Sequence, residues 1–147
     1  MIKIKIKYSN DYVNNGLEEI QKISVGDWID LRAAMTVKIR QGEYYEIPLG
    51  IAVQLPKNYE AHIVPRSSAF KHWGIIQTNS MGIIDNSYCG DNDYWCMPVY
   101  ATRNAKIKQG ERVCQFRIFK NMPKIDLVKV EVLNNDSRGG LGSTGRK

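Results

Sequence analysis

The amino-acid sequence predicts an all-β fold of the jelly-roll or β-barrel kind, with one short helix. Short β-patterned runs dominate the chain, and turn residues interrupt them roughly every eight to fifteen positions. Few segments show the helical repeat of apolar residues. At 147 residues the chain is most simply one domain, long enough to bury a sizeable core. Many short strands with so little helix favour a closed barrel or a two-sheet sandwich.

The first strand is expected at residues 2–8. Apolar and basic residues alternate strictly over residues 1–7, which is typical of a strand and unlike the continuous apolar region of a signal peptide. Alternation, or a short apolar run between turn residues, predicts the other strands. They are expected at 36–40, 46–55, 60–65, 74–78, 81–85, 94–101, 112–119 and 125–132. The last of these alternates and should be half exposed.

Two segments carry helical signals. Loosely periodic apolar residues predict a helical turn or two over residues 17–23. Residues 67–73 are expected to form the one short helix, with Ser67 as its N-cap after Pro65 has fixed the entry of the chain.

Composition narrows the class of protein. No apolar run approaches the roughly 18 residues of a membrane span, so no membrane partner and a cytoplasmic location are expected. The net charge of +6 is scattered, which suits a small anionic ligand better than nucleic acid, and no specific nucleic-acid partner is expected. The three cysteines lack close CxxC spacing, which argues against a disulfide framework or a zinc site.

The C-terminal segment from Arg138 to Gly145 is rich in glycine and also carries Ser143 and Thr144. Such a segment cannot build a core, because glycine loses much backbone freedom on ordering. It can wrap an anion closely with backbone N–H groups, two hydroxyls and a guanidinium. The alternative is an ordinary disordered terminus.

Pro65-Arg66-Ser67-Ser68 lies between an expected strand and the expected helix. A helix N-terminus offers unpaired N–H groups to a phosphate, and Arg66 with two hydroxyls would add charge-assisted donors. Simple helix capping, which needs only one serine, is the competing explanation.

A second candidate segment runs from Asn79 to Gly90. Asp85 follows the apolar pair Ile83-Ile84, and partial desolvation there would raise its basicity and suit a general base. Tyr88 could lay its ring against a cyclic substrate. An ordinary Asp-Asn-Ser turn after a strand is the alternative.

Two further segments carry weaker signals. Arg112 and Gln115 are three residues apart and should point to opposite faces of an extended strand. Asp30 lies between apolar residues, which is costly unless it meets a cation, a donor or a metal-bound water. A structural salt bridge is the competing account of Asp30.

These segments together resemble the motifs of the trimeric dUTPase family, in order and over residues 26–145. They are Asp-Leu-x-Ala from Asp30, Pro-Arg-Ser-Ser from Pro65, Gly-x-Ile-Asp-x-x-Tyr-x-Gly from Gly82, Gly-x-Arg-x-x-Gln from Gly110, and Arg-Gly-Gly-x-Gly-Ser-Thr-Gly from Arg138. The sequence resembles most the subset from Gram-positive bacteria and their phages.

The resemblance implies a jelly-roll homotrimer that hydrolyses dUTP to dUMP and pyrophosphate with Mg²⁺ at sites shared between subunits. It implies a single β domain at 1–135 and a flexible tail at 136–147 that closes over a neighbouring subunit's site. It makes Asp85 the base that activates water, and Asp30 the acid that holds a magnesium-bound water. The residues implied for the uracil and the sugar are Asn79, Gly82, Ile83, Ile84 and Tyr88. The residues implied for the phosphates are Arg66, Ser67, Ser68, Gln115, Arg138, Ser143 and Thr144.

The sequence departs from the family pattern in three places. Leu141 stands where most members carry an aromatic that stacks on the base, and we expect Tyr94, or else Trp95, to cover the base instead. Trp28 and Ile29 replace the usual Ala-Gly pair before Asp30. The doubled serine after Arg66 also occurs in dCTP deaminases of the same fold.

Two other functions stay open at this point. A dCTP deaminase, which could be bifunctional, would use a carboxylate beside the base as its proton shuttle. A regulatory protein partner is also compatible with the sequence, if nucleotide binding orders the tail and switches a protein contact.

Overall fold

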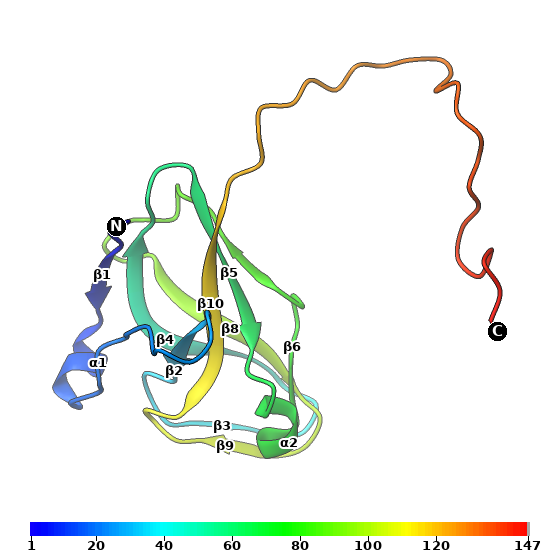
Figure 1. Cartoon of the computed structure of the whole chain (residues 1–147). Coiled ribbons are helices and arrows are strands. Elements are labelled where there is room, and N and C mark those ends of the chain that lie inside the picture. The colour runs from blue at the N-terminus through cyan, green and yellow to red at the C-terminus, as the bar shows by residue number, and fades with distance from the viewer. Residues whose placement is uncertain (147) are drawn as a thin grey trace.

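The computed structural model describes residues 1–146, which form a β-sandwich with an extended C-terminal segment (Figure 1). The strands are β1 (Lys5–Tyr8), β2 (Ile29–Arg32), β3 (Val37–Ile39), β4 (Tyr44–Gln54), β5 (Tyr59–Pro65), β6 (Ile75–Gln77), β7 (Gly82–Ile84), β8 (Tyr94–Ala101), β9 (Ala105–Ile107) and β10 (Arg112–Lys120). The helices are α1 (Asn10–Asn14) and α2 (Ala69–Trp73). The all-β, jelly-roll-like fold class predicted from the sequence is confirmed.

Two antiparallel sheets enclose the core. One sheet has the order β1-β4-β8-β6, the other β2-β10-β5-β7, and β3 pairs with β9 as a separate ribbon. Trp95 on β8 and Phe116 on β10 are both almost fully buried, and their rings meet edge to face with centroids 5.3 Å apart. This contact joins the two sheets through their inner faces, as expected of a sandwich core.

The strands expected from the sequence between 36 and 119 all form, and β8 has the bounds that were predicted. The sequence analysis missed β2 and β9, which alternate but are only four and three residues long. The helix expected at 17–23 does not form. The helix in this part of the chain is α1, where the Ser9 side chain accepts a hydrogen bond from the Tyr12 N–H and Tyr12 is buried. Ile20 is instead held in a loop by donating its N–H to the Tyr8 hydroxyl at 2.8 Å.

The strand expected at 125–132 is wrong for the single chain. Residues 121–130 have no assigned secondary structure, and the segment runs away from the sandwich after β10 (Figure 1). Leu127 is 88% exposed and Leu133 78% exposed. The residues alternate as a strand should, but no strand within residues 1–146 lies beside them to accept their backbone hydrogen bonds.

No helix among residues 1–146 has the length and apolar character that crossing a membrane requires.

Candidate functional site

The first group of predicted site residues lines a cavity of about 500 Å³, here called the hairpin cavity. Its lining comes from the β6–β7 connection, from β7 and from the start of the loop after β7. Residues of β4 and β8, which belong to the same sheet as β6, also line it. The cavity brings together all seven residues predicted for the base, the sugar and catalysis: Asn79, Gly82, Ile83, Ile84, Asp85, Tyr88 and Tyr94.

The hairpin wall is held against β5 by backbone pairing. Gly82 is the cross-strand partner of Ile63, and the turn before it places Ser80 at a positive φ of 60°. A Cβ on Gly82 would lie 3.3 Å from the Cβ of Ile63, closer than ordinary contact. Glycine therefore lets β7 approach β5 closely and leaves the backbone of β7 open to the cavity.

Asp85 leaves the end of β7 and is exposed. Its Oδ1 accepts the Ser87 N–H at 2.7 Å. Hydrogen bonds from the Ser87 side chain and then from the Ser87 backbone lower the pKa of Asp85 below its ordinary value. The expectation that desolvation raises the basicity of Asp85 is therefore wrong for the single chain. The carboxylate is ionised at neutral pH and can accept a proton.

Two tyrosines form the rim of the hairpin cavity. The Tyr88 hydroxyl donates to the Tyr94 carbonyl oxygen at 3.2 Å, which ties the loop after β7 to the start of β8. The Lys7 ammonium lies 5.8 Å from the centre of the Tyr94 ring. Both tyrosines line the hairpin cavity.

The second group of predicted residues gathers around Asp30 on β2. Its Oδ1 lies 3.2 Å from Arg66 Nε, and its Oδ2 lies 3.1 Å from Arg112 Nη1. The side chain of Asp30 is 24% exposed. The structural salt bridge that the sequence left as an alternative is therefore present, and it involves two arginines.

Arg112 and Gln115 face the same side of the sheet, so the expectation of opposite faces is wrong. Gln115 is the cross-strand partner of Asp30, and Arg112 is the partner of Arg32. The pairing shifts between Arg112 and Cys114, as a β-bulge does. In a regular strand, residues three apart point to opposite faces. The bulge adds one residue between Arg112 and Gln115, so their side chains point to the same face.

Three arginines line one cavity of about 390 Å³, here called the arginine cavity. They are Arg32, Arg66 and Arg112, and His72 and Trp73 of α2 complete part of the wall. Arg32 also donates to the Gly110 carbonyl oxygen at 2.8 Å. Guanidinium groups held in this way can bind phosphate oxygens through several N–H groups. The predicted site residues did not include Arg32 and Arg112, although the alternation of Asp30, Leu31 and Arg32 could have indicated a shared face.

Ser67 and Ser68 precede α2. The helix begins at Ala69 with Ser68 in the N-cap position, so the prediction of Ser67 as N-cap is wrong. The Ser68 side chain makes no capping bond, and neither hydroxyl has a hydrogen-bond partner within residues 1–146. Helix capping therefore does not explain the pair. The Gln115 Nε2 makes a long contact of 3.4 Å with the Pro65 carbonyl oxygen next to this segment.

The predicted tail residues are not brought to either cavity. Arg138, Ser143 and Thr144 are exposed, and they lie in the segment that Figure 1 shows extending away from the sandwich. The backbone there makes only local turns, such as the bond from the Ser143 N–H to the Gly140 carbonyl oxygen at 3.0 Å.

Within residues 1–146, no group of three or more His, Cys, Asp or Glu side chains could hold a metal ion. Both oxygens of Asp30 meet arginines, which leaves them one further lone pair each at most. Mg²⁺ commonly keeps several waters and takes one or two carboxylates together with substrate phosphates. The donor set here fits a magnesium ion held mainly by a phosphate ligand, and does not fit a cage built from protein alone.

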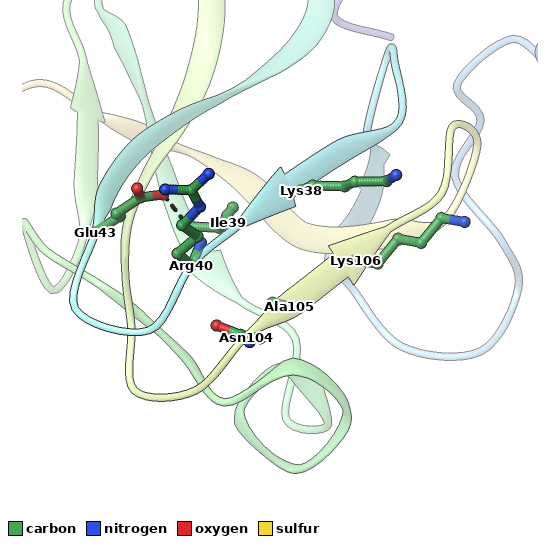
Figure 2. Close-up of a pocket in the computed structure, with 7 residues that line it drawn as sticks. All are labelled: Lys38, Ile39, Arg40, Glu43, Asn104, Ala105 and Lys106. Atoms are coloured by element: carbon green, nitrogen blue, oxygen red, sulfur yellow. Dashed lines mark hydrogen bonds between the residues drawn. The ribbon is translucent and has the colours of Figure 1, made fainter.

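A further cavity, of about 770 Å³, is lined by none of the predicted residues. It lies at the β3–β9 ribbon, and Figure 2 shows Arg40 beside Glu43 at one end and Lys38 and Lys106 extended at the other. Lys38 and Lys106 are cross-strand partners and both are exposed. This is a solvated basic face, and its size alone does not make it a site.

Comparisons with known proteins support the resemblance. The profile of the dUTPase family matches residues 25–145. The SPbeta prophage-derived deoxyuridine 5'-triphosphate nucleotidohydrolase YosS of Bacillus subtilis is 56% identical over 146 residues, which are 99% of this chain and 100% of the relative. The deoxyuridine 5'-triphosphate nucleotidohydrolase of Rickettsia prowazekii is 35% identical over 150 residues, covering 99% and 98% of the two chains.

A solved structure of a Staphylococcus bacteriophage 80alpha dUTPase variant with dUpNHpp has the same fold. Its TM-score is 0.78 at 18% identity, and the match covers 98% of this chain and 99% of the phage protein. The dUTPase from Streptococcus mutans matches 82% of this chain and 98% of its own, with a TM-score of 0.73 at 21% identity. At these identities the likeness concerns the fold.

Proposed function

The chain belongs to the dUTPase family, and we propose that it hydrolyses dUTP to dUMP and pyrophosphate. One observation carries the proposal from the residues upward: a single cavity collects Asp85 together with the hairpin residues, Tyr88 of the same motif, and Tyr94, the aromatic expected to cover the base. The relatives that cover nearly the whole chain carry the same activity in their names.

In the proposed reaction, Asp85 accepts a proton from a water molecule. The water attacks the phosphorus nearest the sugar, the bond from that phosphorus to the bridging oxygen breaks, and pyrophosphate leaves. The low pKa of Asp85 keeps it ionised and able to orient the water. Attack on phosphorus needs positioning and charge neutralisation more than a covalent intermediate. No nucleophilic side chain is required.

The phosphates are proposed to bind at the arginine cavity. Arg66 is oriented by Asp30, and the free hydroxyls of Ser67 and Ser68 stand next to it. Gln115, on the same face as Asp30, can donate its amide N–H to a phosphate oxygen. Mg²⁺, held on the triphosphate with a water bonded to Asp30, would neutralise charge on the phosphate oxygens.

A homotrimer with shared sites is part of the proposal. The hairpin cavity and the arginine cavity have no lining residue in common, so one chain presents two half-sites. The strand-patterned segment around Leu127 is exposed and unpaired in the described chain, which a neighbouring subunit could remedy. Arg138, Ser143 and Thr144 lie beyond that segment and could then close over a neighbour's phosphates.

The direct test is release of pyrophosphate from dUTP, measured beside dTTP, dCTP and UTP with Mg²⁺ present. We expect dUTP to be the preferred substrate. The substitution Asp85→Asn removes the proposed general base. It should lower kcat by roughly 10²–10⁴-fold, because the amide cannot take the proton from water. Binding of dUTP should survive, since the change is nearly isosteric. Full activity of Asp85→Asn, or release of ammonia from dCTP as the main reaction, would refute the proposal.

A further inference from the structure

Gln77 stands out in the core because it is polar. It is 4% exposed, and it is the one buried polar or charged side chain among residues 1–146. It is the last residue of β6, where the chain leaves one sheet and turns toward β7 of the other. Its cross-strand partner on β8 is Val99, which is fully buried.

The Gln77 amide makes two hydrogen bonds, both as a donor. Its Nε2 lies 3.0 Å from the Ile63 carbonyl oxygen and 2.9 Å from the Asn79 Oδ1. Both partners are acceptors, so the amide nitrogen must face them. The Gln77 Oε1 is left buried, with no partner in the described part of the chain.

This arrangement is poor for stability alone. Gln77 Oε1 is a buried acceptor without a partner, which is costly. The two donated bonds join β6 to β5 and to the residue at the tip of the hairpin. We therefore look for the benefit of Gln77 at Asn79.

The bond from Gln77 fixes which way the Asn79 amide points. Because Asn79 Oδ1 already accepts from Gln77, the Nδ2 with its two N–H groups must point to the other side. That side is the hairpin, since a Cβ on Gly82 would lie 3.5 Å from Asn79 Nδ2. Asn79 and Gly82 both line the hairpin cavity, so the cavity presents a donor at this edge.

We propose that Gln77 is a positioning residue that locks the Asn79 amide with its N–H groups toward the base. The lock selects a pyrimidine with a carbonyl oxygen at that edge over one with an amino group, because two donors that face each other are costly once the bound ligand excludes water from between them. The inference rests on the proposed function, and it extends that function by naming a residue outside the five motifs that sets the choice between uracil and cytosine.

The test compares selectivity in two variants. Gln77→Leu keeps the volume and releases the Asn79 amide, which can then turn. Gln77→Glu would be protonated in this apolar place and could donate to Ile63 while its other oxygen accepts from Asn79 Nδ2. That turns Asn79 Oδ1 toward the base. The measured quantities are the ratio of kcat/KM for dUTP over dCTP and the ratio of their binding constants by calorimetry.

We expect both ratios to fall by about tenfold in Gln77→Leu and further in Gln77→Glu, chiefly because dCTP improves. Gln109→Leu is the matched control, since Gln109 also donates from Nε2 to a backbone carbonyl, that of Ala34 at 2.7 Å, away from the hairpin cavity. It should leave both ratios unchanged.

A purely structural Gln77 would lower the melting temperature and both activities, yet keep the ratios within about twofold of the unsubstituted protein, and that result would overturn the proposal. Equal binding of dUTP and dCTP to the unsubstituted protein would overturn it as well. If the unsubstituted protein released no pyrophosphate from dUTP, the proposed reaction would fail, while the two binding ratios would still decide the role of Gln77.

Discussion

The predicted residues of the hairpin cavity are held by contacts within the chain, whereas those of the C-terminal segment are not. In the hairpin cavity, β7 pairs with β5, Gln77 fixes Asn79, and Tyr88 is bonded to the start of β8. The side chains of Asn79 and Tyr88 are therefore held by hydrogen bonds within the single chain. In the C-terminal segment, Arg138 and its neighbours are exposed and make only local contacts.

Under the proposed function, this difference would let the two regions take different parts in binding the substrate. Recognition of a nucleobase requires hydrogen-bonding groups at fixed spacing, and a paired β-hairpin supplies them with little further loss of conformational entropy on binding. Enclosure of a triphosphate requires a segment that can open to admit it and to release pyrophosphate. The glycines of the tail provide that freedom, with Gly139 and Gly142 both at positive φ.

Of the changes that test the difference between the two regions, removal of the tail should have the largest effect on kcat/KM for dUTP. Deletion of residues 136–147 is expected to lower kcat/KM for dUTP by roughly a hundredfold, because each charge-assisted bond to phosphate contributes about 1.5–3 kcal/mol. The melting temperature should stay the same, since residues 136–146 are exposed. Steady-state pyrophosphate release and a thermal melt measure the two quantities.

Two single substitutions sharpen the tail prediction. Arg138→Ala should account for much of the loss, whereas Arg146→Ala removes an equal charge from the same segment and should change little. Equal losses in both would mean that the tail acts through its net charge alone. An unchanged kcat/KM in the deletion variant would mean that the tail takes no part.

The two regions also differ in how well the sequence predicts them. Six of the seven residues of the hairpin cavity were assigned through the motif resemblance, and Tyr94 was expected there because Leu141 cannot stack on a base. The structure brings all seven together, and the pairing of β5 with β7 helps to do so. The strand at 125–132 was predicted by alternation and does not form. Alternation identifies a segment that can pair, but not whether its partner belongs to the same chain.

The arginine cavity illustrates a second limit. The side that Arg112 faces depends on a bulge next to it, and a bulge changes the parity of every residue beyond it. Gln77 gives a third case, because its bonds to Ile63 and Asn79 join elements of different sheets. Such contacts depend on how the sheets pack, which the spacing of residues along one strand does not reveal.

Loss of the Tyr94 ring should have an intermediate effect. Leu141 cannot stack on a base, and Tyr94 on the rim of the hairpin cavity is the aromatic that we expect to cover it. Tyr94→Ala should raise KM for dUTP by about tenfold, since stacking contributes ~0.5–1.5 kcal/mol beyond the buried area. Tyr94→Phe should keep most of the affinity.

Tyr100→Ala is the control for Tyr94, because Tyr100 is an exposed tyrosine of the same strand that does not line the hairpin cavity. Its KM should not change. Unaltered affinity and turnover in Tyr94→Ala would show that Tyr94 does not cover the nucleobase. A residue of the tail would then be the next candidate.

The smallest expected effect concerns Ser87, which affects the pKa of Asp85 in the hairpin cavity. Ser87 lowers the pKa of Asp85 first through its side chain and then through its backbone N–H. Ser87→Ala removes only the first, so the pKa of Asp85 should rise while staying acidic. A lowered pKa keeps the carboxylate ionised as the pH falls, so its loss should move the acid limb of kcat/KM to higher pH. At neutral pH the rate should not change, because Asp85 is ionised in both proteins. Ser87→Thr retains the hydroxyl and should keep the original profile. If the acid limb stayed in place in Ser87→Ala, a group other than Asp85 would control it. That result would contradict the assignment of Asp85 as the general base.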